Sequence, residues 1–97
     1  MEWEVRQSPA FKVWVLSLRD RTARAIILRR IDRIAVGNFG DVKAMGGGVS
    51  ELRVNHGPGY RIYFVRRGET LVVILCGGDK GSQSKDVARA KALAQEI

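Results

Sequence analysis

The sequence is poor in the residues that would tie it to disulfides or metal ions. Its 97 residues include one cysteine, Cys76, and one histidine, His56. A single cysteine excludes an internal disulfide and fits a reducing cytoplasm. Because cysteine and histidine do not cluster, the sequence gives no support for a structural zinc site. We therefore expect neither a metal ion nor another cofactor.

Long apolar runs and a leader segment are also missing. No run approaches the roughly 20 apolar residues that a membrane-spanning helix requires. The first ten residues, MEWEVRQSPA, lack the basic start and the apolar stretch of a signal peptide. These absences predict a cytoplasmic protein with no membrane partner.

Acidic residues are few compared with basic ones. Ten Asp and Glu residues stand against 17 Lys and Arg residues, which gives a net charge of +7. Of those 17 basic residues, 12 are arginines, whose planar guanidinium suits bidentate binding of phosphate or carboxylate. The charge therefore indicates an anionic partner: nucleic acid, an acidic protein or a membrane surface. The apolar content of 45% predicts a folded chain, and the length predicts a single domain over residues 1–97.

The first third of the chain reads as one strand and two helices. Residues 2–7 alternate between apolar and polar, which predicts a short strand. Ser8 and Pro9 form a helix start, and apolar residues recur at helical spacing through residue 19. Asp20 can cap a second helix that Gly37 would end. The short link between the two helices predicts an antiparallel helical hairpin.

The rest of the chain reads as three strands and a final helix. Strands are predicted at residues 50–55, 60–66 and 70–76, and a helix at 84–97. The glycine-rich stretches at 37–49 and 77–83 are expected to be irregular connections; the first lacks the Gly-Lys-Ser/Thr ending of a P-loop. The order is β-α-α-β-β-β-α. We expect an α+β fold with a small antiparallel sheet packed against the helical hairpin and the last helix.

Residues 51–64, ELRVNHGPGYRIYF, predict a β-hairpin with arginines inside its strands. A three-residue Gly57–Gly59 loop would place Leu52 opposite Phe64, and Arg53 beside Tyr63. Alternation then puts the apolar residues on one face of the sheet. Arg53 and Arg61 fall together on the other face.

Three stretches resemble the RelE/ParE superfamily of toxins, in particular its HigB-like addiction module killer proteins. They are RIDRIAVGNFGDVKAMGGGVSELRV, GPGYRIYF and CGGDKGSQSKDVARAKALA, and the resemblance runs from about Phe11 to Ala94. It implies a toxin of a type II toxin–antitoxin system, held inactive by a helix-turn-helix (HigA-like) antitoxin in a complex that can bind operator DNA. Many members of this superfamily are metal-independent endonucleases that cut mRNA on the ribosome. The ParE members instead inhibit DNA gyrase, and fold alone does not choose between these activities.

Cleavage of RNA without metal needs a base for the 2′-hydroxyl, cations for the phosphoryl oxygens and an acid for the leaving oxygen. Arg53 and Arg61 suit the cation role, and Arg61 occupies the arginine position of the resembled family's GYR strand. The alternative is that these arginines only pair with Glu51, with Asp86 or with an acidic antitoxin.

Lys80 is the main candidate for moving protons, because a lysine among arginines can act as acid or base while an arginine cannot act as a base. Weaker candidates for moving protons are His56, Asp86, Lys43 and Lys85. His56 otherwise reads as a solvated loop residue. Asp86 otherwise reads as a favourable charge at a helix start, or as a group that orients Lys80 or Arg61.

The remaining candidates would contact RNA. Lys43 and Lys85 flank the hairpin, and Tyr63 would stack on a base or simply pack across the strands. The arginine-rich face of the second helix would contact ribosomal RNA or the antitoxin, or be solvated; it includes Arg29, Arg30 and Arg33. RelE-like enzymes carry an arginine and a tyrosine near the positions of Gln83 and Val87, so this chain departs from that pattern, with Gln83 left as an RNA contact.

Overall fold

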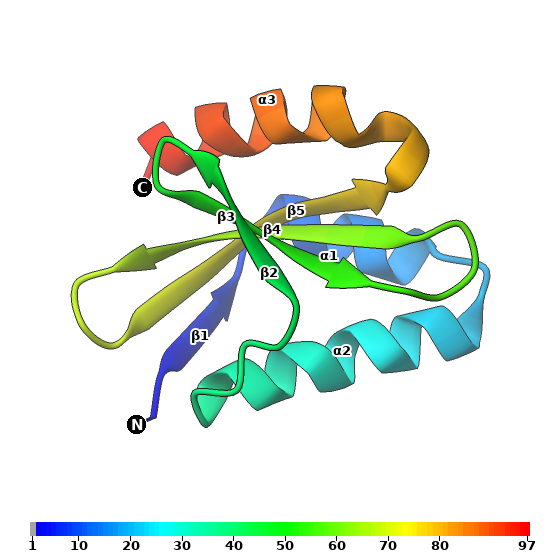
Figure 1. The fold of residues 1–97 in the computed structure, drawn as a ribbon, viewed down its shortest axis with the longest axis horizontal. Helices are drawn as coiled ribbons and strands as arrows, with labels where there is room; N and C mark the ends of the chain where they lie inside the picture. The colour runs from blue at the N-terminus through cyan, green and yellow to red at the C-terminus, as the bar shows by residue number, and fades with distance from the viewer. Residues whose placement is uncertain (1) are drawn as a thin grey trace.

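The computed structural model describes residues 2–97, which form one mixed sheet with helices on both faces (Figure 1). The strands lie in the order β1-β5-β4-β3-β2. Along the chain the elements are β1 (Glu4–Gln7), α1 (Pro9–Ser17), α2 (Arg21–Ala35), β2 (Val42–Gly46), β3 (Val49–Val54), β4 (Tyr60–Arg67), β5 (Leu71–Asp79), a short 3-10 turn η1 (Lys80–Ser82) and α3 (Gln83–Gln95).

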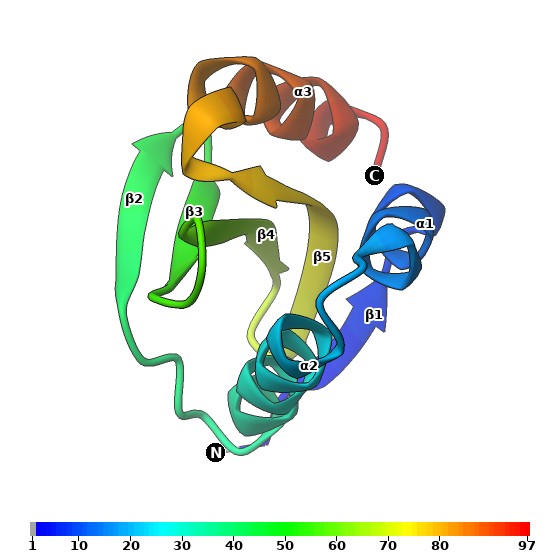
Figure 2. The same ribbon diagram turned by 90° about the vertical axis from the view of Figure 1, so that its right-hand side faces the viewer.

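The predicted α+β architecture is confirmed, with one refinement. Strands β5, β4, β3 and β2 are antiparallel to one another, whereas β1 lies parallel beside β5 at the edge. In the rotated view, α1 and α2 lie on one side of the curved sheet and α3 lies on the other (Figure 2). A helix on each face explains why β5 is apolar along most of its length: both of its sides are buried.

Both predicted helix starts are confirmed by their capping bonds. The hydroxyl of Ser8 accepts from the Phe11 backbone N–H at 3.1 Å, and the carboxylate of Asp20 accepts from the Ala23 N–H at 3.1 Å. Helix α1 ends at Ser17, slightly earlier than its apolar pattern suggested. Each cap satisfies a backbone donor that the first helical turn leaves free.

Two apolar clusters hold the layers together. The larger one joins α1 and α2 to one sheet face; it includes Phe11, Val15, Ile27, Ile31, Ile34, Leu52, Ile62, Phe64 and Ile74. The smaller one joins α3 to the other face; it includes Val49, Tyr63, Val65, Leu75, Cys76, Ala90 and Ala94. The smaller cluster covers only part of its sheet face, and polar side chains of the site described below share that face.

The stretch at 37–49 was wrongly predicted to be irregular throughout, because it contains strand β2. Residues Val42–Gly46 pair with β3, and Gly46, Gly47 and Gly48 all have positive φ where the chain turns between the two strands. Glycine adopts that backbone conformation without strain. Strand β2 forms an edge of the sheet and is mostly exposed, so its sequence carries little apolar alternation.

The stretch at 77–83 was also wrongly predicted to be a loop, because Gly77 and Gly78 continue β5. A Cβ atom at Gly77 would collide with the indole ring of Trp14, and one at Gly78 would collide with the carboxylate of Asp86. These glycines serve the close approach of α1 and α3 to the strand.

The hairpin register differs by two residues from the predicted one. Leu52 lies opposite Ile62, Val54 opposite Tyr60, and five residues, 55–59, connect the strands. The longer loop arises because Tyr60 belongs to the buried part of the strand, with its ring 6.2 Å from that of Trp14. A shift of two leaves every side chain on its predicted face. It also places Arg53 directly opposite Arg61.

No helix within residues 2–97 is long and apolar enough to cross a membrane.

The close packing at Gly77 gives a direct test of the fold. Gly77→Ala should lower the free energy of unfolding by about 1–3 kcal/mol, because the new methyl group displaces the Trp14 ring. Urea unfolding measures this loss. In a Trp14→Leu background the same glycine change should cost much less, and an equal cost in both backgrounds would show that the ring is not the obstacle.

Candidate nucleic-acid interface

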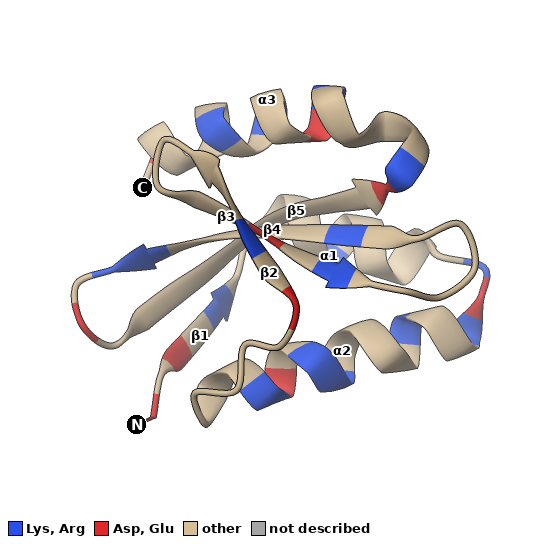
Figure 3. Cartoon of the chain, in the orientation of Figure 1, with Lys and Arg blue, Asp and Glu red and all other residues tan. Residues whose placement is uncertain are grey.

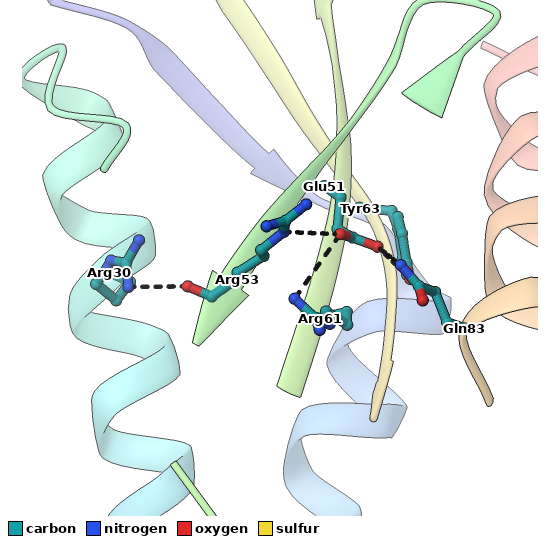
Figure 4. A network of polar contacts seen from close by, with 6 residues as sticks. All are labelled: Arg30, Glu51, Arg53, Arg61, Tyr63 and Gln83. Atoms are coloured by element: carbon teal, nitrogen blue, oxygen red, sulfur yellow. Dashed lines mark hydrogen bonds and ion pairs between the residues drawn. The ribbon is translucent and has the colours of Figure 1, made fainter. Parts of the chain in front are cut away.

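The register of the sheet lines up charged side chains in two neighbouring rows on the α3 side. In one row Lys43, Glu51 and Tyr63 lie opposite one another on β2, β3 and β4. In the next row Arg53 lies opposite Arg61. Since strand partners project to the same side, these residues share one face. Figure 4 shows how the side chains of Arg53, Arg61 and Tyr63 converge on Glu51.

Glu51 is the centre of this arrangement. Its side chain is 0% exposed, and its carboxylate accepts from Tyr63 Oη at 3.0 Å, Gln83 Nε2 at 2.8 Å and Arg53 Nε at 3.2 Å. The Arg61 guanidinium lies 3.9 Å from the same carboxylate. The contacts join β3, β4 and the first residue of α3 through one side chain (Figure 4).

These partners set the protonation state of the cluster. Burial alone would raise the pKa of Glu51, but hydrogen bonds from Gln83, Tyr63 and Arg53 and the charge of Arg61 outweigh it and lower the pKa. Burial, followed by the bond to Glu51, raises the pKa of Tyr63. At neutral pH Glu51 is therefore a carboxylate and Tyr63 a neutral phenol.

The two arginines are not equivalent. Arg53 is 31% exposed and uses its Nε–H on Glu51, whereas Arg61 is 15% exposed and its Nε–H is buried without a hydrogen-bond acceptor among residues 2–97. Two guanidinium groups share a single carboxylate, so the three groups together keep a charge of +1. Arg61 therefore keeps positive charge that Glu51 does not fully neutralise, which favours an anionic ligand.

Arg61 opens onto a hollow that also receives two other predicted catalytic residues. The hollow has a volume of about 320 Å³ and is lined by Asn55, His56, Gly57, Pro58, Gly59, Arg61 and Lys80. The backbone N–H of Lys80 donates to the Gly59 carbonyl at 2.8 Å, which fastens η1 to the hairpin loop. The structure thus brings Arg61, Lys80 and His56 to one site, with Arg53 directly across the strand from Arg61.

His56 and Asp86 each have a structural partner. His56 Nε2 lies 3.0 Å from Asp20 Oδ2, so the ring links the hairpin loop to the start of α2. The backbone bond from Ala23 and then the contact with His56 lower the pKa of Asp20. Asp86 accepts from the Ser82 hydroxyl in the first turn of α3, as expected of a charge at a helix start.

Some of the predicted RNA contacts are exposed, whereas others are bound to Glu51 inside the protein. Lys43 and Lys85 are exposed, and Lys85 shares a second hollow of about 400 Å³ with Lys80 and the turn that follows it. Of the two roles expected for Tyr63, the structure shows packing across the strands: its ring is fully buried in the α3 cluster and cannot stack on a base. Gln83 is partly buried, and its amide is bound to Glu51.

The arginines of α2 also separate. Arg29 and Arg33 are exposed. Figure 3 shows that basic positions recur along α2. Arg30 instead donates from Nη1 to the Arg53 backbone carbonyl at 3.1 Å. Arg30 therefore connects α2 to β3 at Arg53 itself.

Glu51 was foreseen only as a possible partner for the arginines, and its central position was missed. Its signal in the sequence is its spacing of two from Arg53, which places both on one face of a strand. Within residues 2–97, no group of three or more His, Cys, Asp and Glu side chains is arranged to hold a metal ion.

The buried carboxylate predicts a specific loss of acid stability. A carboxylate whose pKa is lowered by folding stabilises the fold above its ordinary pKa, about 4.3 for glutamate, and loses this effect as the pH falls through the folded value. Glu51→Gln should therefore lower the free energy of unfolding by about 3 kcal/mol at pH 7, and the difference from the unmodified protein should shrink at pH 3. Urea titrations at both pH values measure this. Glu69→Gln, in an exposed turn, is the control and should change little; a constant Glu51→Gln effect across pH would contradict the prediction.

Comparison with known proteins agrees with this architecture. An uncharacterized protein of Haemophilus influenzae (strain ATCC 51907 / DSM 11121 / KW20 / Rd) is 43% identical over 97 residues, which are 100% of this chain and 98% of that protein. The free-state structure of a mutant E. coli toxin RelE matches with a TM-score of 0.75 and 13% identity, over 95% of this chain and 96% of that one, which shows a shared fold. A family model described as Phage derived protein Gp49-like (DUF891) matches residues 14–97. The chain therefore belongs to the Gp49-like family and has the fold of RelE.

Proposed function

We propose that this protein is a HigB-like toxin of a type II toxin–antitoxin system that cleaves mRNA on the ribosome without a metal ion. The observation that carries the proposal is Arg61, whose guanidinium shares the single carboxylate of Glu51 with Arg53 and whose side chain lines an open hollow with Lys80. A phosphoryl group in that hollow would balance the positive charge that Glu51 leaves uncompensated. Membership of the Gp49-like family and the RelE fold support the same class of function.

The arginines would stabilise the charge that develops during cleavage. The ribose 2′-oxygen forms a bond to phosphorus and the bond from phosphorus to the 5′-oxygen breaks, leaving a 2′,3′-cyclic phosphate and a 5′-hydroxyl. Negative charge grows on the phosphoryl oxygens in between. Arg61 and Arg53 are held by Glu51 before substrate arrives, so little reorganisation is needed when that charge appears.

Lys80 would move the protons. It is exposed at the rim of the hollow, and an ammonium group can protonate the departing 5′-oxygen, or its neutral form can accept the 2′-hydroxyl proton. His56 lines the same hollow, but its contact with Asp20 makes it a less free partner. Asp86 faces Gly78 and Ser82 and would act only by orienting its neighbours.

The proposed partners follow from the same function. A helix-turn-helix antitoxin of the HigA type would hold the toxin inactive in the cytoplasm, and the complex would bind operator DNA. The exposed cations Lys43, Lys85, Arg29 and Arg33 would contact messenger or ribosomal RNA through its phosphates.

Replacing Arg61 tests the site. Arg61→Ala should abolish growth arrest on induction, because about 10²–10³-fold in rate depends on a preorganised cation of this kind. The variant should still bind the antitoxin, which shows that it folds. Arg66→Ala, an arginine at the far end of the same strand, is the matched control. Full toxicity of an Arg53→Ala/Arg61→Ala double variant would refute the assignment.

Mapping of transcript 5′ ends after brief induction tests the reaction. New internal ends that need translation of the message, and that vanish with Arg61→Ala, are the expected result. Intact transcripts together with DNA-damage signalling would instead identify a ParE-like inhibitor of DNA gyrase.

A pair of substitutions at Lys80 separates charge from proton transfer. Lys80→Arg keeps the positive charge but provides no usable base, and Lys80→Met removes both. We expect both variants to lose about 10²–10⁴-fold in cleavage rate, measured as accumulation of cut message in a purified translation system. If Lys80→Arg cleaves like the unmodified protein, Lys80 contributes only its charge.

A further inference from the structure

Helix α1 is apolar on the side that faces away from the protein as well as on the buried side. Phe11 and Val15 pack into the core, yet Val13 and Leu16 are 72% and 69% exposed. Residues three apart lie side by side on a helix, so these two form one apolar ridge. Lys12 is the one charged residue in the helix. A surface helix normally shows solvent a polar face, and one that is apolar all round is normally covered.

A hollow of about 470 Å³ lies beside this ridge. Residues Pro9, Ala10, Val13, Trp14 and Ser17 of α1 line it, and Arg89 of α3 completes its wall. The surface of α1 therefore has a projecting apolar part, the Val13 and Leu16 ridge, and an apolar hollow beside it. Such a surface suits the side chains of a partner helix, which interdigitate with those of α1.

The charges around this surface indicate the kind of partner. Arg89 borders the hollow beside the ridge. A different hollow, on the other side of α1, is lined by Val5, Arg6, Gln7 and Lys12. Neither lining includes an acidic residue within the described 2–97 range. A second copy of this chain, also carrying a net charge of +7, would meet repulsion here. A bilayer is a poorer fit than a helix, because a flat surface does not fill a recess.

We propose that the α1 surface, formed by Pro9, Ala10, Val13, Trp14, Leu16 and Arg89, binds an acidic amphipathic helix of the antitoxin. This inference rests on the proposed function, and it places the antitoxin away from the face that carries Arg53 and Glu51. Apolar residues of the partner helix fill the hollow and cover Val13 and Leu16, while its carboxylates face Arg89 and Lys12.

Trp14 connects this surface to the candidate site. Its indole lines the hollow, packs on Gly77 of β5 and lies against Tyr60 of β4. Gly77 and Tyr60 directly adjoin Gly78 and Arg61, which are partners across β4 and β5. A bound helix therefore contacts a side chain that supports the strands carrying the site, although it does not enter the site itself.

The decisive experiment is an escape assay in cells that contain the protein encoded beside this gene, which serves as the antitoxin probe. Val13→Glu/Leu16→Glu should remain toxic, because both positions are exposed, but the neighbouring protein should no longer neutralise it. With purified proteins, its dissociation constant for that partner should rise by at least about tenfold. Val36→Glu, an equally exposed apolar position at the end of α2, is the matched control and should be neutralised normally.

The other outcomes separate the two proposals. If the neighbour neutralises the double variant as well as the unmodified chain, the α1 surface is wrong and the toxin function stands. If the unmodified chain neither arrests growth nor binds the neighbour, both fall. Binding to phosphatidylglycerol vesicles that depends on Val13 and Leu16, with antitoxin binding unchanged, would replace the proposal by a membrane surface.

A fluorescence measurement tests the same surface without the double variant, so its result does not depend on whether that variant folds. In a Trp3→Phe background Trp14 is the remaining tryptophan, so its emission should shift when the purified neighbour binds. An unchanged spectrum at saturation would overturn the surface without any substitution on α1.

Discussion

A buried carboxylate between two guanidinium groups is the constraint on which the rest of this structure depends. Glu51 has no access to water, so its charge must be compensated within the protein. Arg53, Arg61, Tyr63 and Gln83 supply that compensation from three different elements. The need to keep Glu51 ionised thus holds β3, β4 and the start of α3 together. It also explains why two arginines can lie side by side within a sheet.

The packing around the site serves the same arrangement. Gly78 leaves room over β5 for Ser82, at the end of η1, and for Asp86, in the first turn of α3, which lets the helix begin close above the strand. On the α2 side of the sheet, Arg30 holds β3 by a hydrogen bond to the backbone carbonyl of Arg53. The positive charge is therefore displayed by a part of the protein that is braced on both faces, which favours a site formed before its ligand arrives.

The sequence predicted what depends on local chemistry and on alternation. The caps at Ser8 and Asp20, the covered strand β5 and the common face of Arg53 and Arg61 all follow from residue type and spacing. Features set by distant packing were not predictable. The register depended on Tyr60 meeting the Trp14 ring, an encounter between residues far apart in the chain.

The same limit applies to the candidate site. Lys80 reaches the hollow of Arg61 as expected, whereas the sequence left the role of His56 open and gave no sign of its contact with Asp20. Tyr63 looked exposed because its strand alternates, yet α3 covers its row. Gln83 stands near a position where RelE-like enzymes carry a catalytic residue, and the sequence gave it no structural role. Its hydrogen-bond partner Glu51 could not be identified without knowing where α3 begins.

The position of β1 has a consequence for how the protein is made. This first strand lies parallel to β5, so Glu4 can pair with Leu71 only after β5 has been synthesised. Lys80 and Gln83 follow later still in the chain. Contacts so distant in sequence cannot form while the C-terminal segment is still being synthesised. The charged site therefore assembles only after the segment that carries Lys80 and Gln83 has been synthesised.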